Sequence, residues 1–454
     1  MFDACLATKS QPPNTTAYMP DNQDNTTIVI GAGAAGLIAA RDLARAGKSV
    51  VLLEARSRIG GRIHTFTGQG FSQPTEAGAE FMHGEVPLTQ ALLRGADIAC
   101  HDTAGRAYAV KQGKAQKSEE FIENMPLLLS TLQALEHDMP LLDFLDEYFP
   151  DDRHHNLRDS AIRFAEGYDA ADAGRASTFA LRDEWTAGGA EDSPRPEGGY
   201  GRLIELLAQQ AQAAGATIQL STVAQEIRWQ RGKVEVICDQ NRRYQAQQLL
   251  VTVPLGVLQA TKGQPGYLRF TPELPEQRAA AAAMGFGPVI KILLEFDEAF
   301  WDAKSAEVVQ PTPEMGFLFS DAPVPTWWSQ LPNPQPLLTG WLGGPAAAKL
   351  HDASAEDIVN QSLESLAYCF QTTPEFLRSH LRGQQVINWG ADPFARGAYA
   401  YATLETASAR PILNQPLDNT LYFAGEALYE GPAMGTVEAA LGSGEQAAKL
   451  MLDK

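Results

Sequence analysis

The chain has 454 residues, with 36 basic and 55 acidic side chains and a net charge of −19. This length allows two or three domains. The acidic balance argues against nucleic acid as a partner and raises the local concentration of cations such as protonated amines. No run of about 18 apolar residues occurs, so we expect no membrane span.

Residues 1–26 form a polar segment without the basic and then apolar order of a secretory signal. We expect a flexible tail and a cytoplasmic protein. The cysteines lie far apart, without metal-ligand spacing, as is typical of reduced thiols. They are Cys5, Cys100, Cys238 and Cys369.

The first ordered motif begins at Thr27. TIVI is a short β-branched run, GAGAAG follows at Gly31–Gly36, and LIAARDLARAG has apolar residues at helical spacing. SVVLLE then gives a second apolar strand that ends at Glu54, which is 54 − 31 = 23 positions after Gly31. Strand, glycine turn, helix, strand and acid in this order predict a dinucleotide site. The pyrophosphate lies at the helix N-terminus and the acid holds a ribose hydroxyl.

A second glycine pair follows the acid in ARSRIGGRIHT, which contains Gly60, Gly61 and Arg62. These residues are suited to a second chain segment that contacts a long cofactor, in which Arg62 would lie near a phosphate or the flavin edge. The motif alone does not distinguish NAD from FAD.

At this point the sequence resembles the FAD-dependent amine oxidases: monoamine oxidases, polyamine oxidases and the flavin lysine-specific histone demethylases. It is closest in style to a bacterial polyamine or monoamine oxidase. The first two matching blocks would also fit other flavin oxidoreductases, whereas the whole set in this order is specific. The blocks are GAGAAG, LLEARSRIGGR, GAEFMHG, VTVPLGVL, LYFAGEA and GTVEAALGSGEQAA.

The resemblance implies an α/β fold, with a discontinuous Rossmann-like FAD-binding domain and an inserted α+β substrate-binding domain. We expect the FAD-binding domain at 27–85, 197–258 and 388–454. The substrate-binding domain is expected at 86–196 and 259–387.

The resemblance also implies which residues contact FAD. Val223 would contact the adenine end, although a plain strand residue explains it equally well. Glu426 would lie on the ribityl or ribose side. The backbone of Thr436 and Val437 would meet the flavin ring, where a helix N-terminus stabilises negative charge. The full predicted set is Gly31, Gly33, Ala35, Gly36, Glu54, Ala55, Arg56, Gly61, Arg62, Gly78, Ala79, Glu80, Phe81, Val223, Trp389, Gly425, Glu426, Thr436 and Val437.

Two side chains are candidates for the chemistry. Lys291 lies in the strand pattern VIKILLEF, on the same face as Leu293 and Glu295. The pattern by itself indicates a solvated face with a Lys–Glu ladder, but the resemblance implies the lysine that reaches a water beside flavin N5. His83 in GAEFMHG is by itself typical of a surface residue, whereas polyamine oxidases carry a histidine or an acid there, at the substrate entrance.

The segment NWGADPFARGAYAYA, residues 388–402, concentrates aromatic residues between Gly and Pro. By resemblance, Trp389 flanks the flavin and Tyr399 is one wall of an aromatic cage. Ala398 stands where monoamine oxidases bond a cysteine to the flavin, so FAD should be noncovalent. The second wall departs from the family, because EGPAMGT offers only Met434, with Tyr429 further back.

The expected reaction is oxidation of an amine to an imine, hydrolysed to an aldehyde plus an amine or ammonia, with O2 reduced to H2O2. The expected partners are the amine and O2, in a monomer or homodimer. An L-amino acid oxidase is one alternative, and Arg182 or Arg396 could meet its carboxylate. A non-catalytic FAD-binding scaffold or sensor is another. We assign no metal site to DDRHHN and no role to Trp327 or Trp328.

Overall fold

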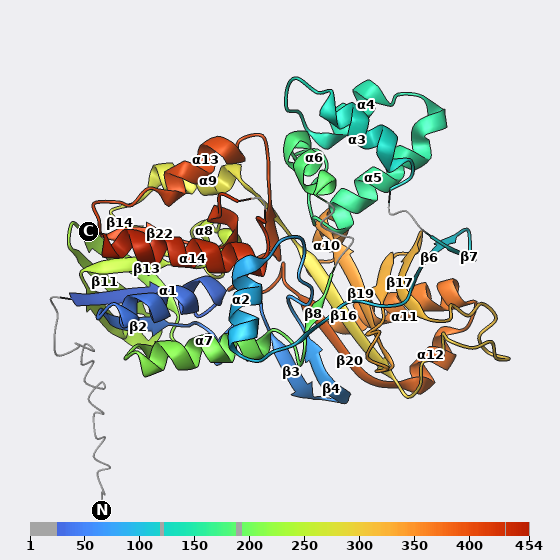
Figure 1. Cartoon of the computed structure of the whole chain (residues 1–454), viewed down its shortest axis with the longest axis horizontal. Helices are drawn as coiled ribbons and strands as arrows, with labels where there is room; N and C mark the ends of the chain where they lie inside the picture. Colours follow the sequence, from blue (N-terminus) through green and yellow to red (C-terminus); the bar gives the residue numbers. More distant parts are fainter. Residues whose placement is uncertain (1–24, 119–121, 188–192, 432, 454) are drawn as a thin grey trace, which may run out of the picture.

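A computed structural model describes residues 25–118, 122–187, 193–431 and 433–453 (Figure 1). Of the predicted tail, only its last two residues belong to this part, and Thr26 already begins the first strand. The rest of the predicted tail, with Cys5, lies outside the described residues.

A parallel five-stranded sheet forms the first region, in the order β22-β13-β1-β2-β9. Its strands come from three separate stretches of the chain. Because successive side chains point to opposite faces, Val29 packs into one core while Ile28 and Ile30 pack into another. The strands are β1 (Thr26–Ile30), β2 (Ser49–Leu53), β9 (Thr217–Gln219), β13 (Gln248–Val251) and β22 (Leu421–Phe423).

Four helices contribute to the core on the first face of this sheet. Helices α1 and α14 lie against each other so closely that a Cβ on Gly444 would be 2.3 Å from the Ala35 carbonyl oxygen. The helices are α1 (Ala34–Arg45), α2 (Pro87–Gly95), α7 (Gly201–Ala213) and α14 (Val437–Leu452).

A four-stranded sheet, in the order β12-β11-β10-β14, contributes to the core on the other face. Helices α9 and α13 pack against each other in the same region. The elements are β10 (Ala224–Gln230), β11 (Lys233–Cys238), β12 (Arg243–Ala246), β14 (Arg269–Thr271), α8 (Leu255–Leu258), α9 (Pro275–Ala283) and α13 (Thr406–Asn414).

The second region is a seven-stranded sheet, in the order β20-β16-β19-β18-β17-β6-β7. Both predicted insertions supply strands to it, because β6 pairs in parallel with β17. The strands are β6 (Arg106–Lys111), β7 (Lys114–Lys117), β16 (Val289–Phe296), β17 (Met315–Ser320), β18 (Thr326–Trp328), β19 (Leu337–Gly343) and β20 (Leu381–Asn388). The neighbouring helices are α10 (Gly344–Lys349), α11 (Ala355–Phe370) and α12 (Pro374–His380).

Four further helices form a bundle with its own apolar core, which stands at the top of Figure 1. They are α3 (Met125–Gln133), α4 (Leu141–Tyr148), α5 (His155–Gly167) and α6 (Thr178–Thr186). Three short strand pairs lie outside the larger sheets: β3 (Thr65–Gly68) with β4 (Phe71–Glu76), β5 (Cys100–His101) with β8 (Arg195–Pro196), and β15 (Gly285–Gly287) with β21 (Tyr399–Tyr401).

Short elements on both sides of the predicted domain boundaries pack across them. Helix α2, predicted in the substrate domain, packs in the core beside α1 and α14, where Glu438 accepts the backbone N–H groups of Leu88 and Thr89. Strand β14 and helix α9 belong with the parallel sheet as well. Conversely, Phe71 of the β3–β4 hairpin packs on Leu293 and Leu337 of the seven-stranded sheet. Sequence blocks mark the motifs but not the short elements that pack beside them.

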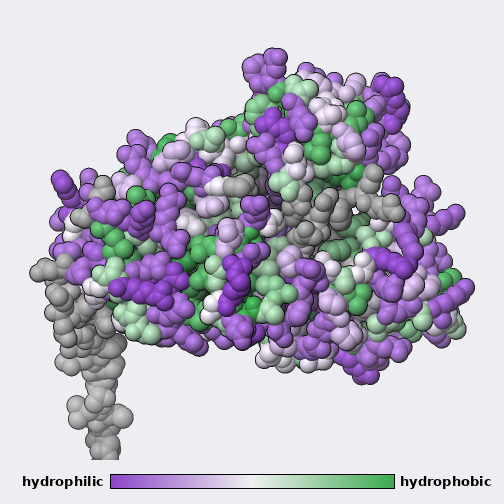
Figure 2. Space-filling view, viewed as in Figure 1, coloured by the Kyte–Doolittle hydropathy of each residue, from purple (hydrophilic) through white to green (hydrophobic). Residues whose placement is uncertain are grey.

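The surface in Figure 2 is mostly hydrophilic, with apolar residues in small scattered groups. Among the described helices, none combines the length and apolar character needed to cross a membrane. The described residues also hold no group of three or more His, Cys, Asp or Glu placed to bind a metal ion. Cys100, Cys238 and Cys369 are free thiols.

Candidate active site

One cavity of about 1910 Å³ extends from the carboxyl edge of the parallel sheet to the seven-stranded sheet and the helical bundle. All the predicted site residues except Gly36 line it, including Lys291, His83 and Tyr399. The structure therefore brings together residues that are up to about 400 positions apart in the sequence.

The glycine turn after β1 fits a closely approaching ligand. Gly31 has φ +104, and a Cβ on Gly36 would lie 1.9 Å from the Gly31 carbonyl oxygen. Gly36 therefore acts behind the cavity wall, where it lets the turn close. Helix α1 begins at Ala34, and its first residues line the cavity, so the positive end of the helix dipole faces this space.

Glu54, at the end of β2, is held by backbone donors. Its two carboxylate oxygens accept the N–H groups of Ala32 and Arg56, both at 2.8 Å. Each oxygen keeps a second lone pair, so the carboxylate can still accept a ribose hydroxyl. Arg56 itself is ion-paired with Asp392 at 2.6 Å and lies over the ring of Phe394.

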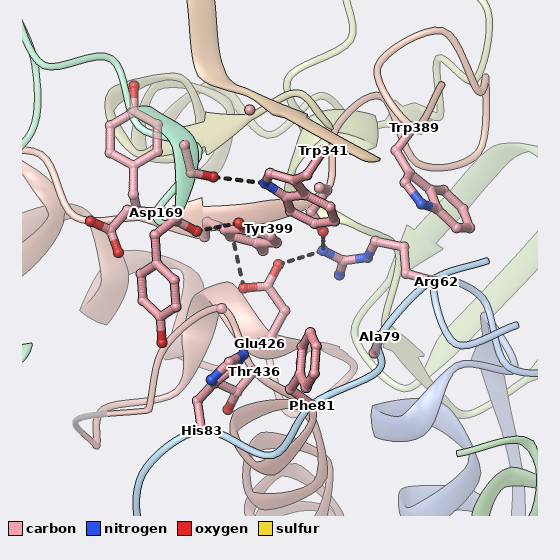
Figure 3. Close-up of a pocket in the computed structure, with 18 of the residues that line it drawn as sticks. Arg62, Ala79, Phe81, His83, Asp169, Trp341, Trp389, Tyr399, Glu426 and Thr436 are labelled. Atoms are coloured by element: carbon pink, nitrogen blue, oxygen red, sulfur yellow. Dashed lines mark hydrogen bonds and ion pairs between the residues drawn. The ribbon is translucent and has the colours of Figure 1, made fainter. Parts of the chain in front are cut away.

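Arg62 connects three segments in the middle of the cavity wall (Figure 3). Its Nη1 donates to the Ala398 carbonyl at 2.5 Å and to Glu426 at 2.8 Å. Glu426 also accepts the Ala400 N–H at 3.3 Å. This network positions the strand that carries Tyr399 against the glycine-rich turn.

The C-terminal helix, α14, begins at the cavity. Thr436 is the N-cap of α14, and its hydroxyl accepts the N–H of Ala439. Thr436 and Val437 line the cavity, so a second helix N-terminus faces it. Val223 lines the cavity too, and its N–H donates to Asp239 at 3.2 Å, which is compatible with both interpretations of this residue.

Lys291 is buried, with 1% of its surface exposed, in a strand that is buried along its whole length. The interpretation of Lys291 and Glu295 as a Lys–Glu ladder on a solvated face of the strand is therefore wrong. The Nζ of Lys291 donates to Glu80 at 2.7 Å and to the Gly78 carbonyl at 3.1 Å. Glu295 instead accepts the N–H of Ser72 at 2.9 Å and the side-chain amide of Gln335. The alternation of β16 itself is as predicted, with Ile290, Ile292, Leu294 and Phe296 in the opposite core.

Glu80 has three side-chain donors. Besides Lys291, it accepts Nε of Arg195 at 2.9 Å and Nε1 of Trp328 at 3.0 Å. Burial alone would raise the pKa of Glu80, but the charges of Lys291 and Arg195 outweigh it and lower the pKa to about 2. Glu80 is therefore a carboxylate, and the cluster of Lys291, Glu80 and Arg195 carries a net positive charge.

The aromatic walls include residues that the sequence did not single out. Trp389 is buried and donates to the Ala77 carbonyl, and the Tyr399 hydroxyl donates to the Tyr168 carbonyl. Trp341 donates to the Gly167 carbonyl at 2.7 Å and lies near Tyr399 in the close-up (Figure 3). Tyr168 and Trp341 also line the cavity and supply aromatic surface in addition to Tyr399.

The two residues considered for the missing cage wall differ in position. Met434 lines the cavity, and its sulfur accepts Nη2 of Arg410. Tyr429 packs on α14 instead, since a Cβ on Gly442 would lie 2.8 Å from its ring, and it is not among the lining residues. Trp328 lines the cavity, whereas Trp327 is fully buried against Gly340.

His83 lies among these aromatic rings. Its Nδ1 is 3.2 Å from the Ser193 hydroxyl, and its ring makes an edge contact with Tyr168 at 5.4 Å between centroids. The His83 ring is also 5.8 Å from the Phe81 ring between centroids, and Figure 3 labels both residues. The position agrees with a residue that faces the substrate, since it lines the cavity.

Two carboxylic acids in the bundle were not predicted. Asp169 and Glu184 both line the cavity, and Oδ2 of Asp169 is buried without a hydrogen-bond partner. Burial and the neighbouring Glu184 raise the pKa of Asp169, and burial raises the pKa of Glu184. If the two carboxylic acids share one proton, both pKa values are raised, as found for Asp169 and Glu184.

The sequence carried one unused signal for Trp341. Alternation in LLTGWLG predicts that Trp341 and Thr339 share one face of the strand, and the structure adds the register that pairs Trp341 with Lys291. Tyr168, Asp169 and Glu184 had no such signal, because only the docking of the bundle brings them to the cavity.

Comparison with known proteins agrees with this geometry. The family model for flavin containing amine oxidoreductases matches residues 34–452. The chain belongs to this family. It is an FAD-dependent amine oxidase by that membership.

Proteins similar to this chain include polyamine oxidases and lysine-specific histone demethylases. The chain is 30% identical to polyamine oxidase 4 of Oryza sativa, over 93% of this chain and 88% of that protein. It is 27% identical to human lysine-specific histone demethylase 2, covering 90% of this chain but only 51% of that protein. A putrescine oxidase structure with bound putrescine shares the fold, with a TM-score of 0.77 at 18% identity over 95% and 99% of the two chains.

The residues present fit FAD. The glycine turn excludes side chains where a pyrophosphate approaches, and the space beside Gly425 is open, because a Cβ there would meet nothing within 4 Å. The cavity exceeds the roughly 300–1,000 Å³ of a site for one drug-sized ligand, so it has room for a dinucleotide and a substrate.

Proposed function

We propose that this enzyme oxidises a primary or secondary amine, polyamines included, to an imine. Water then hydrolyses the imine to an aldehyde or ketone plus ammonia or a smaller amine, and O2 is reduced to H2O2. The observation that supports this is one cavity that is lined by the glycine turn after β1, by aromatic side chains and by the buried Lys291. When bound, the flavin supplies the two-electron oxidation of a C–H bond next to nitrogen.

In this proposal the side chains bind, orient and exclude water. The faces of Tyr399 and Trp341 attract a cationic amine by about 0.5–2 kcal/mol per contact. The Lys291 ammonium donates two hydrogen bonds to protein acceptors, so one of its three N–H donors is left to hold a water at the cavity wall. That positive charge would assist oxygen reduction.

The substrate class follows from the acids that line the cavity. Asp169 and Glu184 bring negative charge to the wall formed by the bundle, which favours a cationic amine over an anionic compound. His83 faces the same space. These residues, together with the similarity to polyamine oxidases, support a polyamine or another cationic amine as substrate.

The L-amino acid oxidase alternative lacks the arginines that were considered for it. Arg182 pairs with Asp183, and Arg396 donates to Gly256 and Pro265. Neither arginine is among the residues that line the cavity.

A peroxide-coupled screen tests the proposal. The purified flavoprotein is offered polyamines, aryl amines and L-amino acids in air, and H2O2 is measured. We expect peroxide with cationic amines, most strongly with polyamines. Peroxide with L-amino acids alone would favour the alternative, and a yellow protein that forms none with any of these compounds would favour a scaffold or sensor.

Attachment of the cofactor has its own test. Ala398 has no side-chain nucleophile to bond with a flavin, so acid precipitation should leave FAD in the supernatant. Flavin that stayed with the precipitated protein would contradict noncovalent binding.

A further inference from the structure

The carboxylate of Glu80 lies at the meeting point of three elements. Glu80 follows β4, Lys291 comes from β16, and Arg195 comes from β8. Both Glu80 and Lys291 are buried, with 7% and 1% of their surfaces exposed. A lone ammonium at that depth would lose its proton or destabilise the fold, so the neighbouring carboxylate decides the charge of the lysine.

Glu80 is itself held rigidly. Arg195 donates to it while also donating to the carbonyls of Leu331 and Ser329, both at 3.2 Å, and it lies over the Phe81 ring at 4.5 Å. Trp328 donates to the same carboxylate oxygen as Arg195, which leaves the other oxygen to Lys291. The acceptor for the ammonium is thus fixed in place before any ligand binds.

The direction of the ammonium follows from this geometry. Two of its N–H groups go to Glu80 and Gly78, on the segment after β4. The third is left for the cavity, which Lys291 lines. Without the Glu80 carboxylate, the ammonium would keep the Gly78 carbonyl and the Trp328 ring, 5.7 Å from Nζ to its centroid, but would lose the charged acceptor that orients it.

We propose that Glu80 is a positioning residue for Lys291: it keeps the lysine charged and aims the remaining N–H into the cavity. Glu80 acts through the lysine, so the inference rests on the proposed function for its effect on turnover. The other charged groups that face the pair are Arg195 and Glu76. Glu76 is engaged by the Thr65 hydroxyl and the Tyr200 N–H, and it does not replace Glu80 in the structure.

The test compares wild type with Glu80→Gln, Lys291→Met and the double variant. Flavin reoxidation by O2 is followed by stopped flow from about pH 6 to about pH 10, where lysines with altered surroundings titrate. The wild-type profile is the reference, and Glu76, whose pKa burial raises to about 7, contributes to it. Glu80→Gln should lose rate as pH rises, towards the loss of about 100-fold that is usual for removing one electrostatic contact to a reacting group.

The double variant separates positioning from structure. With Lys291 already absent, Glu80→Gln should cost less than about twofold further. Glu80→Asp, which keeps the charge, should restore part of the wild-type profile. A wild-type pH profile in Glu80→Gln, or full additivity in the double variant, would overturn the proposal.

A second readout does not depend on turnover. In Glu80→Gln the buried Lys291 ammonium has lost its carboxylate partner. The lysine therefore binds its proton more readily in the unfolded state than in the folded state. The free energy of unfolding should then rise with pH between about 7 and 10. This rise should be absent in the double variant. Equal pH dependence of unfolding in the two would overturn the charge-holding role of Glu80. Unchanged reoxidation in Lys291→Met would instead overturn the proposed role of Lys291 and, with it, the effect of Glu80 on turnover.

Discussion

At the scale of single residues, the site depends on charges buried beside one another. Lys291 and Glu80 form one such pair, and Glu76 lies behind them with its Oε2 buried and without a hydrogen-bond partner. Buried charges without partners are costly, so each of these groups should leave a measurable mark on rate or stability.

Lys291→Met should separate the two halves of the reaction. Anaerobic reduction of the flavin by the amine should stay within a few-fold of wild type, because the proposal gives the lysine no part in it. Reoxidation by O2 should slow by about 100-fold, because a positive charge is lost where negative charge develops. Stopped-flow traces that show unchanged reoxidation would contradict the assignment.

Glu76 should make stability depend on pH. Burial, only partly offset by Lys291, raises its pKa from the ordinary value of 4.5 to about 7. A raised carboxyl pKa contributes stability below about pH 4.5, and this is lost as pH rises through about 7. The difference is worth roughly 3 kcal/mol. The Glu76→Gln variant should therefore become more stable relative to wild type as pH rises from about 4.5 through about 7.

Urea unfolding at about pH 5 and about pH 8 measures the effect of Glu76. The exposed Glu364→Gln is the matched control and should show no such pH-dependent gain. A Glu76→Gln variant whose stability runs parallel to wild type across the window would refute the argument.

At the scale of elements, the close contact of α1 and α14 sets the position of both helix N-termini at the cavity. A Cβ on Gly444 would lie 2.3 Å from the Ala35 carbonyl oxygen and 2.7 Å from a methyl carbon of Ile38. The glycine is therefore required for helix approach, not for its own backbone conformation.

Gly444→Ala should push the two helices apart. We expect a loss of about 1–3 kcal/mol in the free energy of unfolding and weaker FAD binding, because both helix ends move. Gly95→Ala is the control, since a Cβ there meets nothing within 4 Å. Flavin titration and denaturation measure both effects, and a Gly444→Ala protein with wild-type values would show that the contact yields without cost.

Prediction from sequence succeeded where a pattern was local. TIVI, the glycine turn, the helix after it and SVVLL became β1, α1 and β2 within a few residues, because their periodicity is set by their own side chains. The docking of α2 and the environment of Lys291 could not be predicted. Both depend on partners over 200 positions away, Glu438 for α2 and Glu80 for the lysine.

At the scale of the whole molecule, two sheets and a helical bundle enclose one cavity. The parallel sheet supplies the dinucleotide edge, the seven-stranded sheet supplies Lys291 and Trp341, and the bundle supplies Tyr168 and Asp169. The predicted candidates for cofactor and chemistry line it because the carboxyl ends of β1 and β2, the N-termini of α1 and α14, and Lys291 of β16 face the same space. The proposed amine oxidation would draw on all three parts, because each supplies residues that line the cavity.

The most direct test of amine oxidation at this cavity is an anaerobic titration of the purified flavoprotein with a polyamine. We predict that the oxidised flavin absorbance bleaches completely with one equivalent of amine per flavin, that an aldehyde is released, and that air restores the yellow colour with one equivalent of H2O2. A flavin that stays oxidised with polyamines, aryl amines and L-amino acids alike would contradict the proposed function.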